Sequence, residues 1–65
     1  MIVHRIFRGH RLHMFDGRVL SVQGSYKIRK TQWYLCVNDA SRDRVDIDRD
    51  SVLQFQREGK CTVTL

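Results

Sequence analysis

The sequence predicts a single small all-β domain over residues 1–65, folded as a barrel of five or six strands. Short runs in which apolar and polar residues alternate recur along the chain, which is typical of half-buried strands. Turn-forming residues separate these runs at intervals of about eight to twelve residues, as in small barrels and sandwiches. Proline is absent, and no stretch has a convincing helical period. We expect a closed or nearly closed barrel, because closure hides strand edges that would otherwise pair with other chains.

The first predicted element covers residues 2–7. Its apolar positions fit either an N-terminal strand or a short N-terminal helix, and both alternatives stay open. Gly9 interrupts this run before the next one begins.

A hairpin is predicted around Asp16-Gly17. Residues 12–15 and 18–22 are alternating runs on either side of this dipeptide. Asp-Gly between two such runs is a strong hairpin signal, because glycine accepts the positive φ of a tight turn. We expect residues 23–25 to break the strand that follows the turn.

The second half of the chain supplies three more predicted strands: residues 31–37, 44–48 and 61–65. The first of these, TQWYLCV, is rich in aromatic and β-branched residues and is the clearest strand. In the second, Val45 and Ile47 alternate with charged residues and are expected to point inward. Residues 51–56 add a further short apolar run, and the polar residues 38–43 and 57–60 are predicted turns.

The predicted core follows from strand alternation. It comprises Leu12, Met14, Leu20, Val22, Trp33, Leu35, Val37, Val45, Ile47, Phe55 and Val63. Trp33 is placed inside because it shares strand parity with Leu35 and Val37. Tyr34 has the opposite parity and is therefore the expected surface ring.

The two cysteines, Cys36 and Cys61, are too few for a disulfide framework and too far apart for a metal-binding CxxC motif. Both lie in apolar, strand-like segments. We expect buried free thiols that act as small hydrophobic residues, and a disulfide between them remains the alternative.

The net charge of +5 is concentrated in the first half of the chain. Residues 1–30 carry seven basic residues and one acid, a balance of +6, whereas residues 31–65 carry five basic and six acidic residues, a balance of −1. A concentrated positive field favours an anionic partner, most often nucleic acid.

A cluster of basic and aromatic residues gives this charge a candidate site. Single-stranded nucleic acid needs cations for its phosphates and flat rings on which its bases stack. The predicted nucleic-acid-binding residues are Arg5, Arg8, Arg11, Arg18, Tyr26, Lys27, Arg29, Lys30 and Tyr34. Tyr26 is expected in a loop, where its ring is free to bind.

An acidic strip is the second candidate surface. Asp43, Asp46 and Asp48 lie on or just before the predicted strand 44–48. They are expected either to contact a basic protein partner or to be surface charges that form local ion pairs with Arg44 and Arg49. Asp46-x-Asp48-x-Asp50 resembles the start of a calcium loop, but the glycine and glutamate that such a loop needs are missing.

Catalysis, metals and cofactors are not expected. No phosphate-binding glycine loop and no nucleophile elbow occurs, and nothing in the spacing assembles a nucleophile with a base. His10 and His13 are three apart in a strand, which points them to opposite faces. No apolar run is long enough for a membrane span and no leader pattern begins the chain, so a cytoplasmic protein is expected.

Three segments of the chain resemble the Rof family of Rho-inhibitor proteins, which are Sm-like barrels. They are RLHMFDGRVLSV (residues 11–22), RKTQWYLCV (residues 29–37) and RVDIDRDSVLQF (residues 44–55), and the closing GKCTVTL also fits. The likeness spans about 50 residues between Leu12 and Leu65. It implies an Sm-like or SH3-like fold and a non-enzymatic regulator that binds the transcription terminator Rho near its RNA-binding site.

Two functions are therefore expected from the sequence. The resemblance implies a Rof-like modulator of Rho or of a related RNA-associated factor in transcription regulation. The charge pattern gives the alternative, direct binding of RNA or single-stranded DNA through a basic face that contains aromatic rings. Assembly of barrels into oligomers through strand edges is a further expectation.

Overall fold

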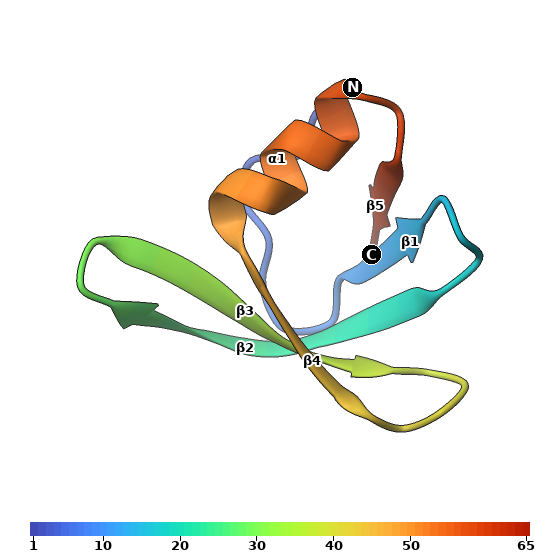
Figure 1. Ribbon diagram of the computed structural model, residues 1–65, viewed down its shortest axis with the longest axis horizontal. Coiled ribbons are helices and arrows are strands. Elements are labelled where there is room, and N and C mark those ends of the chain that lie inside the picture. Colours follow the sequence, from blue (N-terminus) through green and yellow to red (C-terminus); the bar gives the residue numbers. More distant parts are fainter.

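Five antiparallel strands and one helix make up the fold in the computed structural model, which describes residues 1–65. The elements are β1 (Arg11–Met14), β2 (Val19–Ile28), β3 (Thr31–Asn38), β4 (Arg44–Asp48), α1 (Arg49–Arg57) and β5 (Cys61–Thr64). The predicted all-β class is confirmed, with a single short helix between the last two strands (Figure 1). This helix is too short to cross a membrane.

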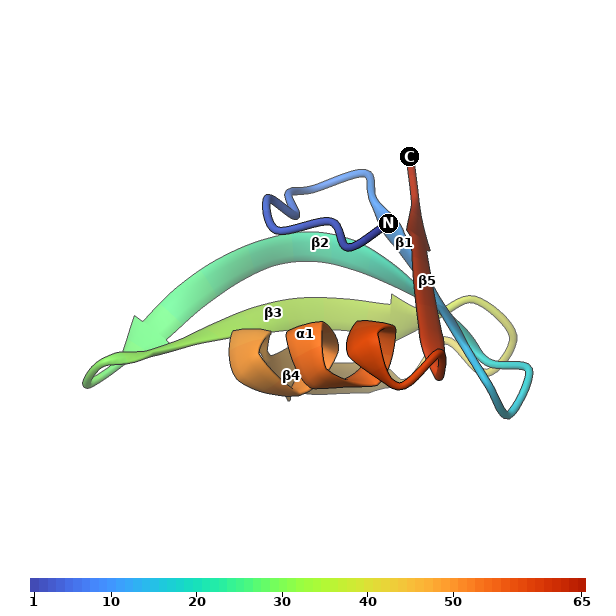
Figure 2. The same cartoon turned by 90° about the horizontal axis from the view of Figure 1, so that it is seen from above.

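The strands form one bent sheet with the order β4-β3-β2-β1-β5, and every pair is antiparallel. Figure 2 shows β2 and β3 running side by side past α1, while β1 and β5 turn away at one end. The edge strands β4 and β5 are not paired with each other, so the barrel-like sheet is open between them. The helix α1 contacts β3, β4 and β5 and lies on the concave side of the sheet.

The hairpin between β1 and β2 forms at the predicted Asp16-Gly17. Gly17 takes a φ of 92°, and the Asp16 carboxylate accepts hydrogen bonds from the backbone N–H of Arg18 at 3.1 Å and from its Nε at 2.7 Å. Hydrogen bonding to Arg18 lowers the pKa of Asp16. The turn residues and their neighbours thus fix the register in which Leu12 faces Leu20.

The expected break at residues 23–25 is wrong, because β2 continues through them to Ile28. The pairing of β2 with β3 shifts by one residue between Val22 and Gly24, which is a β-bulge. Gly24 is therefore a strand residue at a bulge rather than a strand terminator, a common role for glycine inside a strand.

The short apolar run at residues 51–56 is part of the helix α1, which the sequence did not predict. The Asp48 carboxylate caps its N-terminus by accepting from the backbone N–H of Ser51 at 3.1 Å. Val52 and Leu53 are buried, and one helical turn further on Phe55 packs against the core. A nine-residue helix repeats its apolar face only once, which is too little for a recognisable helical period.

Residues 1–10 form neither the N-terminal strand nor the N-terminal helix that their pattern allowed. Instead the side-chain amide of Gln56 on α1 grips the backbone of Val3, accepting from its N–H at 2.8 Å and donating to its carbonyl at 2.9 Å. Ile6 is buried in the core and Val3 packs against it. The segment is thus held against the helix in extended, irregular form.

The core contains most of the predicted residues, but the β3 residues that point into it are the opposite set from the one predicted. Its buried members are Ile6, Leu12, Met14, Leu20, Val22, Tyr34, Cys36, Val52 and Cys61, with Val3, Val45, Ile47, Phe55 and Val63 packed against them. Both cysteines are buried and free, which confirms that part of the prediction.

Placing Trp33, Leu35 and Val37 inside and Tyr34 outside is therefore wrong. Cys36 pairs with the buried Val22 and so points inward, and Tyr34, two residues away, follows it with 1% exposure. Trp33, Leu35 and Val37 are only partly buried, on the opposite side of β3. Every residue from Trp33 to Val37 is apolar or aromatic, so alternation alone could not choose between the two faces.

Candidate functional site

The tip of the β2–β3 hairpin divides the predicted basic and aromatic cluster between two faces of the sheet. Tyr26 is paired with Trp33, and the next pair is Lys27 with Gln32. Because successive strand residues point to opposite faces, the first pair lies on one side and the second on the other. The rings of Tyr26 and Trp33 therefore do not share a surface with Lys27, contrary to the sequence interpretation.

The hairpin tip is exposed because it extends beyond its neighbours. β4 pairs with β3 only as far as Trp33, and β1 pairs with β2 only at residues 19–21. Ile28 and Thr31 form the last pair, and Arg29 enters the tight turn with a φ of 57°. The side chains near this turn consequently border solvent on both faces of the hairpin.

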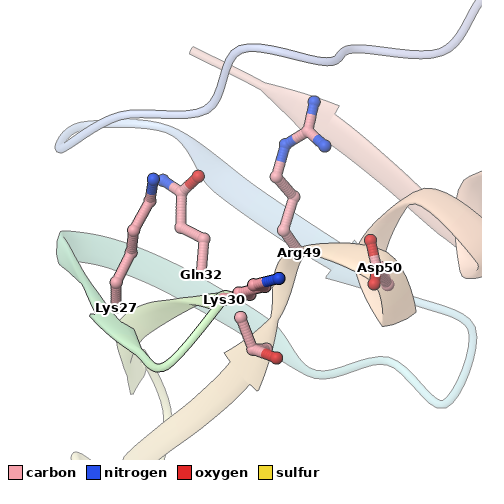
Figure 3. Close-up of a pocket in the computed structure, with 6 residues that line it drawn as sticks. Lys27, Lys30, Gln32, Arg49 and Asp50 are labelled. Carbon is pink, nitrogen blue, oxygen red and sulfur yellow. The ribbon is translucent and has the colours of Figure 1, made fainter.

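A polar cleft of about 230 Å³ lies between this tip and the start of α1. It is lined by Lys27, Lys30, Thr31, Gln32, Arg49 and Asp50. In Figure 3, Lys27 and Gln32 extend side by side from the hairpin, and Arg49 extends from the first turn of the helix toward the same side. Three cations and one carboxylate thus surround a cleft that has no hydrophobic lining residue.

A second cleft of about 430 Å³ adjoins the first, since Gln32 and Arg49 line both. Its other lining residues are His4, Arg5, Ile6, Phe7 and Tyr34. The two clefts together are called the basic groove below. The groove runs from Lys27 and Lys30 on the hairpin, past Arg49, to Arg5 and Phe7 on the N-terminal segment.

Tyr34 belongs to the floor of this groove and is not the free surface ring that was predicted. Burial raises the pKa of its phenol, while the nearby Arg49 guanidinium opposes that rise. With 1% of its surface exposed, the ring cannot stack on a ligand. The correction follows from the orientation of β3 described above.

Phe7 is the exposed ring of the groove, and the sequence interpretation missed it. Its side chain is 59% exposed although the residue lies in an apolar run. The neighbouring turn is fixed by His10, whose Nδ1 lies 3.1 Å from both the backbone nitrogen and the backbone oxygen of Phe7. The rings of Phe7 and His10 also contact each other, with centroids 5.1 Å apart. Phe7 is thus presented outward from a hydrogen-bonded turn.

Arg49 was also missed, because it directly follows the predicted acidic strand 44–48, where no helix was expected. It is the first residue of α1 and follows the N-cap Asp48 directly. Because the chain leaves β4 at this point, the side chain of Arg49 does not follow the alternation of that strand. It lies where the two clefts meet. The one sequence signal was Asp48-x-x-Ser51, a short polar pattern that precedes the apolar residues of the helix.

The other predicted cations lie outside the groove. Arg18 forms a salt bridge with Asp16 at the β1–β2 turn, with Nε and Oδ2 2.7 Å apart. Arg11 lines a third cleft, on the opposite side of the sheet from α1. Arg8 and Arg29 are exposed and line none of the clefts. Of the predicted basic residues, the structure therefore brings together Arg5, Lys27 and Lys30.

The predicted acidic strip is largely engaged within the protein. The Asp46 carboxylate accepts hydrogen bonds from Arg44 and from the hydroxyl of Tyr26, and these contacts lower its pKa to about 2. Asp48 caps α1, and its hydrogen bonds with Ser51 lower its pKa. Asp43 is exposed beside these residues. Tyr26 is consequently part of a hydrogen-bonded strand contact and not of a free loop.

The histidines have separate surroundings. His10 is buried in the turn described above, whereas Nε2 of His13 lies 2.8 Å from the hydroxyl of Thr64 on β5. No group of three or more histidine, cysteine or acidic side chains is placed to hold a metal ion.

Comparison of the chain with protein-family models, with curated proteins and with solved structures finds no match. The inference about function therefore starts from the residues of the basic groove.

Proposed function

We propose that the protein is a non-enzymatic binding module that holds single-stranded nucleic acid in the basic groove. The observation that supports this most directly is the convergence of Lys27, Lys30 and Arg49 on one cleft. Phosphate groups spaced along a flexible strand are the ligand that such a row of cations suits best.

The cations of the groove are available to a ligand. None of Lys27, Lys30, Arg49 and Arg5 forms a salt bridge within the protein, whose ion pairs involve Arg18, Arg44 and Lys60. Asp50 is the single acid that lines the groove. An incoming phosphate would therefore meet positive charge that is not already neutralised by an internal partner.

The exposed ring of Phe7 favours a single strand over a duplex. Bases in a duplex are stacked on each other, whereas unpaired bases can stack on a protein ring, with a gain of about 1–3 kcal/mol per base. Phe7 lies in the same cleft as Arg5 and Arg49. One ring beside several cations thus supplies both contacts that a single strand makes.

Fluorescence anisotropy with labelled twelve-residue DNA and RNA single strands, and with the matching duplex, tests the proposal. We expect single strands to bind more tightly than the duplex, with an affinity that falls steeply as salt is raised, because binding releases counterions. The double variant Lys27→Gln/Lys30→Gln is expected to weaken binding at least about tenfold at 50 mM salt. Phe7→Ala should weaken it about five- to tenfold with little change in the salt dependence.

The matched control is Arg18→Gln/Arg57→Gln, which also removes two positive charges but from residues that do not line the groove. If both double variants weaken binding equally, the interaction depends on net charge and the groove is not the site. If no single strand binds the wild-type protein at 50 mM salt, the proposal is wrong.

A second proposal is that the protein is a Rof-like modulator of Rho or of a related RNA-associated factor. It is supported by the resemblance together with the places of the resembling segments, which form the β1–β2 hairpin, β3 and the β4–α1 unit of one sheet. Transcription termination with purified Rho is expected to decrease when the protein is added. Full termination at a saturating concentration of the protein, and no capture of Rho from nuclease-treated lysate, would rule this function out.

A further inference from the structure

We propose that the face of the sheet opposite α1 docks an extended peptide segment of another protein, one that carries a carboxylate next to apolar side chains. This outer face is defined by three residues of β3 and by their paired neighbours on β2 and β4. They are Trp33, Leu35 and Val37 on β3, Ser21, Gly24 and Tyr26 on β2, and Arg44, Asp46 and Asp48 on β4. It shares no residue with the basic groove, so it is independent of the proposed nucleic-acid site.

A row of apolar side chains runs along the middle of the outer face. Trp33, Leu35 and Val37 alternate with the core residues Tyr34 and Cys36, and all three remain partly exposed. The helix and the N-terminal segment pack on the core side, where Val52 and Ile6 are buried. No helix or N-terminal segment therefore covers the row, and the Tyr26–Asp46 hydrogen bond crosses it between Trp33 and Leu35. Its two-residue spacing, about 7 Å per step, matches alternate side chains of an extended peptide.

Gly24 leaves an open notch in the outer face beside Leu35. It is the β2 partner of Leu35, and a Cβ added at Gly24 would meet no atom within 4 Å. Tyr26 lies on the other side of this notch. Its hydroxyl is hydrogen-bonded to Asp46 across β3, so the position of its ring is fixed. The space beside Leu35 is open at least to a Cβ-sized group, and we expect one apolar side chain of the ligand to enter it.

One end of the row is positively charged. Val37 borders a cleft of about 600 Å³ whose other lining residues are Arg11, Ser21, Gln23, Asp39 and Arg42. Neither Arg11 nor Arg42 forms a salt bridge, whereas the Asp39 carboxylate already accepts a hydrogen bond from the Ser21 hydroxyl at 2.5 Å. Two guanidinium groups next to an apolar row suit a carboxylate, which arginine binds through paired hydrogen bonds.

Two carboxylates, Asp46 and Asp48, border the row beside Leu35 and Trp33, with Asp46 already in a salt bridge with Arg44, and they favour a peptide over a nucleic acid. Asp46 is paired with Leu35 and Asp48 with Trp33, and contacts with Arg44 and Ser51 favour their ionised forms. A phosphate chain laid along β3 would meet these carboxylates after leaving Arg11 and Arg42. A peptide with its acid at the Val37 end and an apolar body over Leu35 and Trp33 meets no such repulsion.

A selection from a displayed library of random twelve-residue peptides tests this surface with no assumed partner. The wild-type protein is the bait, and peptides retained by the Gly24→Val variant are removed. Valine suits a strand position with open space, so this variant is expected to fold while its side chain fills the notch. We expect the selected peptides to share an acidic residue beside two or more alternating apolar residues.

Affinity is then measured with the best selected peptide, through the emission of Trp33, the only tryptophan of the chain. Arg11→Gln/Arg42→Gln is expected to weaken binding at least about tenfold, and the control Arg18→Gln/Arg57→Gln to change it less than about twofold. Oligonucleotide affinity should be the same for Gly24→Val and for the wild type.

Three results would overturn the proposal. The first is that no peptide is enriched over the Gly24→Val variant. The second is that the enriched peptides are basic or lack acids. The third is a dimer in light scattering that Gly24→Val converts to a monomer, since the outer face would then be covered by a second copy of the chain.

Discussion

The hydroxyl of Tyr26 on β2 donates a hydrogen bond to the carboxylate of Asp46 on β4, across the intervening strand β3. Arg44 holds the same carboxylate through its Nε and a terminal nitrogen, each 2.9 Å from an oxygen of Asp46. Arg44 first and Tyr26 second lower the pKa of Asp46 to about 2, and the contact raises the pKa of Tyr26. This bridge ties the long β2–β3 hairpin to the edge strand β4.

The Asp46 bridge predicts a stability loss in acid. The folded pKa of Asp46 lies below its ordinary value of 3.8, so its contribution is complete above about pH 4 and is lost as pH falls toward 2. Asp46→Asn should lower the free energy of unfolding at pH 7 by about 1 kcal/mol or less, because the pair is at the surface. Urea unfolding at several pH values measures both effects.

The matched control for this prediction is Asp43→Asn, whose side chain is exposed on the turn before β4. It should keep the wild-type slope of stability against pH, whereas Asp46→Asn should flatten that slope between pH 4 and pH 2. Equal slopes for the wild type and Asp46→Asn would show that the bridge does not stabilise the fold.

Tyr34 is expected to be far more important for stability than its neighbour Trp33. Tyr34 is 1% exposed, and truncation of a buried aromatic residue costs about 3–5 kcal/mol. A 65-residue domain has about that much stability in total, so Tyr34→Ala should be unfolded at 25 °C. Trp33→Ala should remain folded, with a loss of about 1–2 kcal/mol. Circular dichroism melts distinguish the two, and an unfolded Trp33→Ala beside a folded Tyr34→Ala would reverse the assignment.

These two residues also show how far sequence reasoning reaches. The strands other than the second half of β2 were predictable because their alternation and the Asp16-Gly17 turn are local signals, and β4 was found with its correct bounds and inward residues. Which side of β3 faces the core was not predictable, because the residues from Trp33 to Val37 are apolar or aromatic on both sides of the strand. Only the pairing of Cys36 with Val22 decides it, and pairing is a long-range property.

The basic groove was half predictable for the same reason. Lys27 and Lys30 were identified from local charge, but Arg49 and Phe7 reach the groove through the helix and the N-terminal segment. Both elements lack a strong local signal, since α1 is too short to show a helical period and residues 1–10 are irregular. Residues that meet only through tertiary packing cannot be grouped by their spacing in the sequence.

The N-cap of α1 predicts a measurable loss when it is removed. Asp48 accepts hydrogen bonds from the backbone and the hydroxyl of Ser51, at 3.1 Å and 2.6 Å. Asp48→Ala should lower stability by about 1 kcal/mol and the melting temperature by about 4–8 °C. Asp48→Ser, which can still cap, should recover most of this loss. A serine variant no more stable than the alanine variant would show that charge, not capping, is what Asp48 supplies.

The two cysteines should react slowly in the folded protein. Burial raises the pKa of the Cys36 thiol to about 11 and also raises the pKa of Cys61, so little thiolate is present at pH 8. Mass spectrometry after iodoacetamide treatment should show almost no modification of the native protein and two additions after unfolding in urea. Rapid labelling of the native protein at one cysteine would mean that this part of the core opens readily.

The hydrogen bonds between the Gln56 side chain and the Val3 backbone should hold the N-terminal part of the groove in place. Its amide makes two hydrogen bonds with the Val3 backbone, and each is worth about 1 kcal/mol. Gln56→Ala should release residues 1–5, raise their hydrogen exchange and disorder Arg5, while Phe7 keeps its turn through His10. Single-strand affinity should fall about fivefold. Gln54→Ala is the control, because Gln54 on the same helix bonds only Glu58. If both variants change exchange and affinity alike, the N-terminal segment does not depend on the Gln56 amide.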